Sequence, residues 1–352
     1  MKKNSLIYIA GHISLAGAAI YNLLKSSGYH NLITANDNEL NLTNQSEVDS
    51  FFHKEQPEYV FLAASKSGGI MANRENPADF AYQNTMIAAN TIHSSYKHNV
   101  KRLINIGASC IYPKHANQPM KEEDLMTGPL EPSVEPTGLS KIVSIKLCNY
   151  YNRQYGTNFI SVTPTNLYGP GDNFALQTAY VIPALIRKFH LAKILSESDM
   201  QLIIDDFKMF TSPLSDVTPP PENDSPIAVL SNINIQKDHV TIWGSGKAFR
   251  EFLYAEDFAD ACVYLMNNHE SANIGEFINV GAGSDISIHD LVLKVVALIG
   301  YKGKIVFDSS KPDGPPKKLL DSSLIRSVGW TNKITLDEGL KRTYEWYVSQ
   351  TD

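Results

Sequence analysis

Two short stretches of the chain carry the side chains best suited to proton transfer. The stretch Asn105-Ile-Gly-Ala-Ser-Cys-Ile-Tyr-Pro113 contributes the Cys110 thiol and the Ser109 hydroxyl. The stretch Glu135-Pro-Thr-Gly-Leu-Ser-Lys141 places Thr137 four residues before Lys141, so a helix would bring both side chains onto one face. An ammonium lowers the pKa of an acidic neighbour, but an aliphatic hydroxyl remains far from the range useful near neutrality. The pattern therefore predicts acid–base chemistry with an ill-suited hydroxyl at residue 137.

A glycine-containing turn follows the first apolar run. In Gly11-His-Ile-Ser-Leu-Ala-Gly17 the first glycine permits a tight turn, and the last lets a helix approach a strand closely. These roles predict a dinucleotide-binding turn, with cofactor contacts from Gly11, His12, Ser14, Leu15 and Gly17. Ser14 occupies the position where the pyrophosphate comes closest to the backbone, so we expect its side chain to weaken binding. A turn that binds dinucleotide poorly or not at all stays open as the alternative.

The residues after the second expected strand bear on the choice of cofactor. An acidic residue about twenty positions beyond the turn binds the ribose 2′-hydroxyl of NAD, whereas Arg there accommodates a 2′-phosphate. Segment 33–38 contains Asp37 and neither Arg nor Lys. These residues favour NAD(H) over NADP(H), although Asp37 fits an exposed turn residue equally well.

Alternating apolar and amphipathic segments would position these side chains. We expect buried parallel strands at Leu6–Ala10, Asn31–Thr34, Tyr59–Ala64, Arg102–Ile106 and Phe159–Pro164. Between them we expect helices at Ala16–Ser27, Gln45–Lys54, Pro77–Asn99 and Leu139–Tyr155. This alternation predicts an α/β fold with a doubly wound parallel Rossmann sheet, whose ligands lie at the carboxyl ends of the strands.

The second half of the chain predicts a smaller α/β substrate-binding domain. We expect residues 1–173 to form the dinucleotide-binding domain, with later segments returning to it, and 174–352 to form mainly the substrate-binding domain. The Pro- and Asp-rich stretch 211–226 suits neither helix nor strand, and we expect an inserted loop at about 192–238. Further helices are expected at Val181–Leu195, Ile288–Ile299 and Leu336–Ser349, with strands at Phe277–Val280 and Lys304–Phe307.

Bulk properties exclude several classes of partner. The chain has 352 residues, 43% of them hydrophobic, and a formal net charge of −6, which gives no reason to expect nucleic acid or an anionic membrane. Cys110, Cys148 and Cys262 lack disulfide or metal-ligand spacing, so we expect reduced thiols, no metal and a cytoplasmic location. The apolar run near the N-terminus is too short for a signal peptide or a membrane span.

Many segments in order resemble the GDP-L-fucose synthase family, which comprises GDP-4-keto-6-deoxymannose epimerase/reductases of the extended short-chain dehydrogenase/reductase type. The matching segments are Ala10-Gly-His12, Glu39-Leu-Asn-Leu42, Leu62-Ala-Ala-Ser-Lys-Ser-Gly-Gly-Ile70, Pro77-Ala-Asp-Phe80, Ser109-Cys-Ile-Tyr-Pro-Lys114, Gln118-Pro-Met120, Lys146-Leu-Cys148, Tyr151-Asn-Arg-Gln-Tyr-Gly156, Pro164-Thr-Asn-Leu-Tyr-Gly-Pro170, Trp243-Gly-Ser-Gly246, Arg250-Glu-Phe252 and Lys311-Pro-Asp-Gly314. Nearly the whole chain is covered, apart from roughly 192–238.

The resemblance implies roles for individual residues. It implies that Cys110 is the base in epimerisation and that Lys141 assists reduction. It also implies that Ala63, Lys141 and Asn166 contact the cofactor and that 174–352 forms mainly a sugar-nucleotide-binding domain. The family's catalytic Ser, Tyr and acidic His fall on Ala108, Thr137 and Tyr180. Its 2′-phosphate contacts fall on positions such as Ile13 and Asp37, while the sugar-nucleotide contacts are better kept, at Asn166, Lys188, Trp243, Arg250 and Lys318. Catalytic contributions are therefore expected from Cys110, Lys141, Tyr180, Thr137 and Ser109.

Three functions remain open from the sequence. The first is an NAD(P)(H)-dependent enzyme that epimerises or reduces a GDP-4-keto-deoxy sugar or heptose. The second is an epimerase without reductase activity, and the third is a GDP-sugar-binding pseudoenzyme or partner subunit. In each case we expect a GDP-sugar ligand and a homodimer.

Overall fold

The computed structural model describes residues 1–68, 70–176, 178–210, 226–311 and 313–350. The chain divides into two compact units. Unit 1 comprises Met1–Leu167, Glu251–Ser284 and Leu319–Ile334, and unit 2 comprises Tyr168–Arg250, Asp285–Lys318 and Thr335–Asp352. Two later segments therefore belong to the same unit as the N-terminal half.

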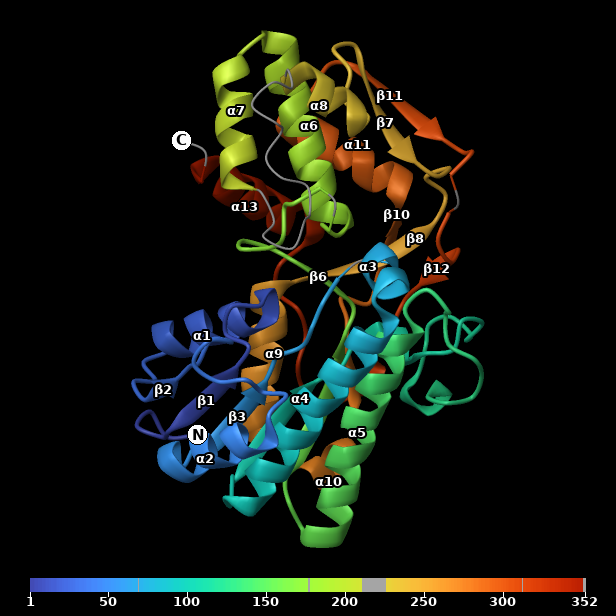
Figure 1. The fold of residues 1–352 in the computed structure, drawn as a ribbon. Helices are drawn as coiled ribbons and strands as arrows, with labels where there is room; N and C mark the ends of the chain where they lie inside the picture. The colour runs from blue at the N-terminus through green and yellow to red at the C-terminus, as the bar shows by residue number, and fades with distance from the viewer. Residues whose placement is uncertain (69, 177, 211–225, 312, 351–352) are drawn as a thin grey trace. The chain divides into compact units, whose positions relative to one another are not determined.

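A six-stranded sheet forms the centre of unit 1, in the order β2-β1-β3-β4-β5-β9 (Figure 1). All of its neighbouring strands are parallel. The strands are β1 (Ile7–Ala10), β2 (Leu32–Ile33), β3 (Tyr59–Leu62), β4 (Arg102–Ile106), β5 (Phe159–Pro164) and β9 (Ile278–Val280). The doubly wound parallel sheet predicted from the sequence is confirmed. The strand order reverses between β1 and β3, and in such sheets ligands bind beyond the carboxyl ends of the strands at this point.

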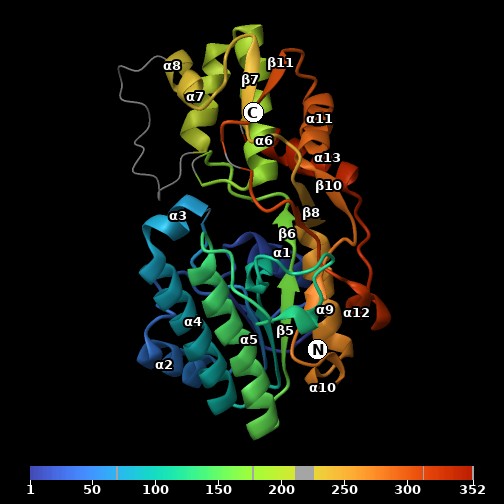
Figure 2. The same ribbon diagram turned by 90° about the vertical axis from the view of Figure 1, so that its right-hand side faces the viewer.

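Helices cover both faces of this sheet. One face packs on α1 (Leu15–Ser26) and α9 (Ala255–Asn268), and the other on α2 (Gln45–Glu55), α4 (Pro77–Lys97) and α5 (Glu135–Tyr155) (Figures 1 and 2). Alternate residues of β1 point to opposite faces, so Ile7 and Ile9 join the first core and Tyr8 and Ala10 the second. The remaining short helices of unit 1 are α3 (Ile70–Glu75), α10 (Ser271–Ile274) and α12 (Ser323–Ser327).

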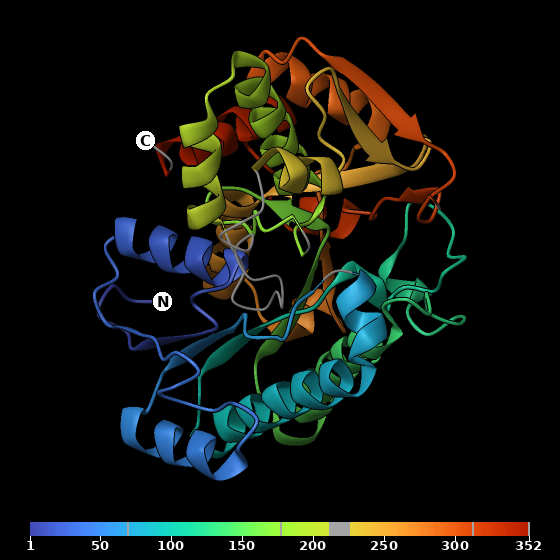
Figure 3. The same ribbon diagram turned by 45° about the horizontal axis from the view of Figure 1, so that its top comes forward.

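Unit 2 combines helices with short strands (Figure 3). Its helices are α6 (Val181–Glu197), α7 (Met200–Met209), α8 (Pro226–Asn232), α11 (Ile288–Ile299) and α13 (Leu336–Ser349). Strand β7 (His239–Trp243) pairs in parallel with β11 (Lys304–Asp308), and β12 (Lys317–Lys318) pairs with the start of β8 (Phe249–Tyr254). Strand β10 (Asp285–Ser287) also belongs to unit 2, whereas β6 (Asn166–Tyr168) and β8 each contain residues of both units.

The expected inserted loop at about 192–238 is partly wrong, because helix occupies much of it. Helix α6 continues to Glu197, and α7 and α8 follow within the segment. Asp199 starts α7 by accepting a hydrogen bond from the Leu202 amide, and Ile203 and Asp206 are buried. Residues 211–225 of the Pro-rich stretch lie outside the described residues, but Pro226 itself begins α8.

A buried ion pair attaches α7 to its neighbours in unit 2. The guanidinium of Arg187 on α6 binds Asp206 on α7 at 2.8 Å, and both side chains are almost fully buried. Arg187 also donates to the carbonyl oxygens of Phe174 and Phe210, while Asp206 accepts a hydrogen bond from the Tyr347 hydroxyl on α13. These contacts join α6, α7 and α13, and the Arg187 guanidinium and the Tyr347 hydroxyl donate to the buried Asp206 carboxylate.

Candidate functional site

The glycine turn lies at the switch point of the unit 1 sheet. Gly11 follows β1 with φ +82°, and a Cβ built on it would lie 2.5 Å from the backbone of Ala64, beyond the end of β3. A Cβ on Gly17 would lie 2.1 Å from the Gly11 carbonyl oxygen. Both positions therefore require glycine, and α1 begins where backbone N–H groups and the positive end of its dipole favour an anion. The turn fits the diphosphate of a nicotinamide dinucleotide.

The Ser14 side chain bonds back into this turn. It is the N-cap of α1, and its hydroxyl donates to the Gly11 carbonyl oxygen at 2.7 Å and accepts from the Gly17 amide at 3.1 Å. Its φ of −73° is an ordinary conformation for any residue. The side chain turns back into the loop because the helix end offers an unpaired amide. The hydroxyl thus bonds within the turn, and weakened dinucleotide binding through Ser14 stays a prediction.

Other predicted cofactor contacts lie around the same turn. Ala63 follows β3 and its amide donates to the Ala10 carbonyl oxygen at 2.9 Å, while Leu15 begins α1. His12 is half-buried, and no group among the described residues bonds to its buried Nδ1. Asp37 is exposed in the turn after β2, and its charge adds to burial in raising the pKa of the Tyr8 phenol.

The predicted acid–base residues Cys110 and Lys141 are close neighbours in unit 1. Cys110 lies in a 3-10 turn (Ser109–Ile111) just beyond β4, and Lys141 lies on α5. The Lys141 ammonium donates to the carbonyl oxygen of Ile106, the last residue of β4, at 2.8 Å. Burial lowers the pKa of Lys141 to about 8, and the Coulomb interaction with Cys110 opposes this by raising it.

Thr137 shares the α5 face of Lys141, as expected, but its hydroxyl is engaged elsewhere. Its Oγ1 donates to Oδ1 of Asn73 on α3 at 2.6 Å, and the amide nitrogen of Asn73 donates to the Gly68 carbonyl oxygen. Asn73 is a residue that sequence reasoning missed, and its separation of 64 positions from Thr137 leaves no spacing signal. Ala108 precedes the 3-10 turn in an extended conformation, and the neighbouring Ser109 is half-buried.

Asn166 positions its amide within unit 1. Its Nδ2 donates to the carbonyl oxygen of Glu251 at 2.8 Å. Glu251 is fully buried, and its carboxylate accepts from the amides of Gly283 and Leu320. The side chain of Asn166 therefore supports the β6–β8 connection.

Apart from Asn166, the expected sugar-nucleotide contacts lie in unit 2, as does Tyr180. Tyr180 is the N-cap of α6 and is 49% exposed, and Lys188 follows on the same helix, where burial lowers the pKa of its ammonium. Trp243 ends β7 and is 62% exposed, with the Lys311 ammonium 5.5 Å from its ring centroid. An exposed indole of this kind offers a flat apolar surface to an aromatic base.

Arg250 is the best-positioned cation of unit 2. Its Nη1 donates to the carbonyl oxygens of Phe249 and Pro315, each at 2.7 Å. A Cβ on Gly314 would lie 2.7 Å from Nη2, so glycine leaves room for the guanidinium. Lys318 on β12 pairs in register with Arg250 on β8. Two cations on adjacent strands suit a diphosphate.

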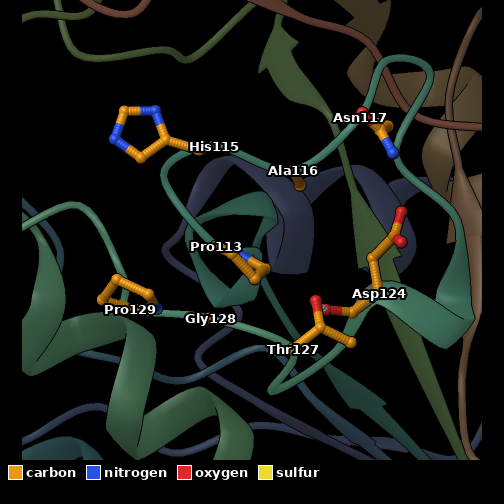
Figure 4. A pocket seen from close by; sticks show the side chains of 8 residues that line it. All are labelled: Pro113, His115, Ala116, Asn117, Asp124, Thr127, Gly128 and Pro129. Atoms are coloured by element: carbon orange, nitrogen blue, oxygen red, sulfur yellow. Dashed lines mark hydrogen bonds between the residues drawn. The ribbon is translucent and has the colours of Figure 1, made fainter.

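A separate hollow of about 300 Å³ lies in the loop that follows the Cys110 turn (Figure 4). It is lined by Pro113, His115, Ala116, Asn117, Asp124, Thr127, Gly128 and Pro129. Figure 4 shows the His115 ring directed away from Pro113. The predicted site residues do not line it. Within the described ranges, no cluster of potential metal ligands occurs and no helix is long and apolar enough to cross a membrane.

The family model named NAD dependent epimerase/dehydratase family matches residues 7–206 and 210–281. The chain belongs to this family, whose fold and glycine turn are those described above. More particularly, it is 44% identical over 348 residues to a putative GDP-L-fucose synthase 2 of Arabidopsis thaliana, covering 99% of this chain and 93% of that protein. The resemblance stated from the sequence is therefore confirmed.

Two solved structures have the same fold over nearly their whole length. One is a GDP-6-OMe-4-keto-L-xylo-heptose reductase from C. jejuni, with 42% identity and a TM-score of 0.93. The other is a GDP-D-glycero-L-gluco-heptose synthase from Campylobacter jejuni in the presence of NADPH, with 41% identity and a TM-score of 0.92. Each match covers 99% of both chains. The chain is thus an enzyme of NAD(P)(H)-dependent type.

Proposed function

We propose that this protein is an NAD(P)(H)-dependent enzyme that epimerises or reduces a GDP-linked 4-keto sugar, either a deoxyhexose or a heptose. The observation that carries the proposal is the juxtaposition of Cys110 and Lys141 in the unit that also holds the Gly11–Gly17 turn. The full-length likeness to enzymes named for GDP-fucose and GDP-heptose synthesis supports the substrate class. A partner subunit or pseudoenzyme is not favoured by these relatives.

We infer that unit 1 holds the dinucleotide and unit 2 the sugar nucleotide. The bound reduced cofactor supplies hydride to the C4 carbon of the keto sugar. The amides at the start of α1 would bind its diphosphate, and the Nδ1 of His12 offers one more polar contact. In unit 2, Trp243 would stack on guanine while Arg250 and Lys318 bind the GDP diphosphate.

The proton chemistry is assigned to Cys110 and Lys141 in unit 1 and to Tyr180 at the start of α6. Cys110 is the proposed base toward a carbon next to the keto group, and Tyr180 is the proposed acid. The oxygen at C4 needs a proton during reduction. We assign it to the Lys141 ammonium or to water, because the Thr137 hydroxyl is bound to Asn73 and is a poor acid.

The engagement of Thr137 favours a second candidate, an epimerase with little reductase activity. The discriminating experiment incubates the protein in deuterated water with a GDP-4-keto-6-deoxy sugar, with and without NADH or NADPH. Cofactor oxidation, with or without deuterium at C3 or C5, supports the main proposal. Deuterium uptake without cofactor oxidation supports the second candidate, and the absence of both contradicts the two.

We also propose a cytoplasmic homodimer. Exposed apolar side chains line α5 at Leu139, Val143 and Tyr150, spacings that place them on one face. A second copy could cover this face, whereas scattered exposed side chains need no partner. Leu139→Glu with Tyr150→Glu should yield a monomer in sedimentation, while Leu293→Glu on α11 should not. A double variant that remains dimeric contradicts the proposed interface.

A further inference from the structure

The chain has a lysine at residue 141, but residue 137 is a threonine and offers no phenol whose pKa the ammonium could lower. The Thr137 hydroxyl donates to Asn73 at 2.6 Å and does not ionise near neutrality. Burial lowers the pKa of Lys141, and the interaction with Cys110 raises it. Burial alone disfavours an ammonium, so a partner that can carry negative charge compensates for its desolvation.

Two contacts bring the Cys110 turn and the Lys141 segment of α5 together. A Cβ on Gly138 would lie 2.7 Å from the Cys110 carbonyl oxygen, so the 3-10 turn lies directly on α5 at this glycine. Lys141 is one helical turn further along α5, on the same face. Its hydrogen bond to the Ile106 carbonyl oxygen holds the ammonium at the end of β4, immediately before the Cys110 turn.

We propose that Lys141 is the positioning residue of Cys110, holding its sulfur as a thiolate that accepts a proton from the substrate carbon next to the keto group. In this step the C–H bond breaks, an S–H bond forms, and the carbon electron pair moves to the keto oxygen as an enolate. No oxidation or reduction occurs. Return of the proton from the thiol to the carbon regenerates the thiolate. When the thiol proton first exchanges with deuterated water, the carbon receives deuterium. The substrate step rests on the proposed function, whereas the ion pair does not.

The ion pair can be tested without substrate or cofactor through the rate of alkylation of Cys110 by iodoacetamide. The thiolate is the nucleophile, so the rate as a function of pH reports the thiolate fraction. Peptide mass spectrometry follows the three cysteines separately. Cys148 and Cys262 are internal controls, because both are buried and burial raises the pKa of Cys148 to about 12.

We expect the alkylation rate of wild-type Cys110 to have its midpoint well below the ordinary thiol value of about 8.5. Lys141→Met should shift the midpoint upward by about one unit or more, a loss of about tenfold in rate near neutrality. Lys141→Arg should preserve much of the fast reaction because it keeps the charge. Lys146→Met, also on α5 but paired with Glu276, should leave the profile unchanged.

Two results would overturn the ion pair. One is a wild-type midpoint at or above the ordinary thiol value, which needs no variant to fold. The other is a folded Lys141→Met protein with the wild-type profile. If the ion pair holds, Lys141→Met should also slow deuterium uptake into the keto sugar and shift its pH profile upward. No deuterium uptake by wild type despite a fast, lysine-dependent Cys110 would overturn the substrate step alone. The proposed function would fail only if the same incubation also showed no cofactor oxidation.

Discussion

At the scale of single residues, the type of a side chain is known from the sequence, whereas its orientation depends on the structure around it. Thr137 and Lys141 share a helix face, as their spacing predicted, because α5 extends through both. The orientation of Ser14 could not be predicted from its identity, because the same serine can project from a turn or cap the helix behind it. The hydrogen bond between Thr137 and Asn73 depends on how α3 and α5 pack, which local sequence does not encode.

Restoring a phenol at residue 137 should strengthen reduction. We expect Thr137→Tyr combined with Ala108→Ser to raise the rate of keto-sugar reduction by about 10²–10⁴-fold, the usual contribution of general acid catalysis. The measurement is the oxidation of the reduced nicotinamide at saturating substrate. Thr127→Tyr, in an exposed loop of the same unit, is the control. An unchanged rate in the double variant would mean that proton donation at C4 does not limit the enzyme.

Replacing Ser14 by glycine should change cofactor binding little. Its hydroxyl bonds within the turn, so we expect the Kd for NADH and NADPH to change by less than about tenfold, and stability by only a few tenths of a kcal/mol. Ser14→Ala, which loses the cap without gaining flexibility, should cost about 1 kcal/mol. Fluorescence titration and urea unfolding measure these effects. A large gain in affinity for Ser14→Gly would show that the side chain does obstruct the diphosphate.

At the scale of elements, periodic segments were predictable and the insertion was not. The structure has β4 and β5 at the predicted residues, and α1, α2 and α4 within one or two residues of prediction, because apolar periodicity and caps determine them locally. Helix α7 was missed beside the Pro-rich stretch. The buried face of α7 includes Asp206. This charged residue can be buried because Arg187 on α6 forms an ion pair with it.

The Arg187–Asp206 pair should be essential for attaching α7. Arg187→Met removes one partner and leaves a buried carboxylate, which typically costs about 3–5 kcal/mol. Urea unfolding of the variant should show this loss. The exposed pair of Lys208 with Asp205 on the same helix is the matched control, and Lys208→Met should cost about 0–1 kcal/mol. Equal losses in the two variants would contradict a structural role for the buried pair.

At the scale of the whole molecule, Asp172 gives the stability of the chain a dependence on pH. Burial raises the pKa of this carboxyl to about 7, and its Oδ2 has no hydrogen-bond partner among the residues described. The unfolded chain releases the proton near the ordinary value of about 3.9. Between these values the folded state holds a proton that the unfolded state has lost, so stability falls as pH rises and levels off above about pH 7.

Asp172→Asn should therefore stabilise the protein increasingly from about pH 4 to about pH 7. Each unit of pH in this window corresponds to about 1.4 kcal/mol. Urea unfolding across the window measures the difference from wild type. Asp205→Asn is a control of opposite sign, because hydrogen bonds from Gln201 and Lys208 lower the pKa of Asp205. A constant difference between Asp172→Asn and wild type would contradict the raised pKa.

The most direct test of the proposed activity is the incubation of wild-type protein with a GDP-4-keto-6-deoxy sugar and NADH or NADPH in deuterated water. One mass spectrum of the product reports both proton exchange and reduction. We predict deuterium at C3 or C5 and a 4-hydroxy sugar formed together with oxidised cofactor. An unlabelled and unreduced keto sugar at high enzyme concentration would contradict the assignment of this protein as a GDP-sugar epimerase/reductase.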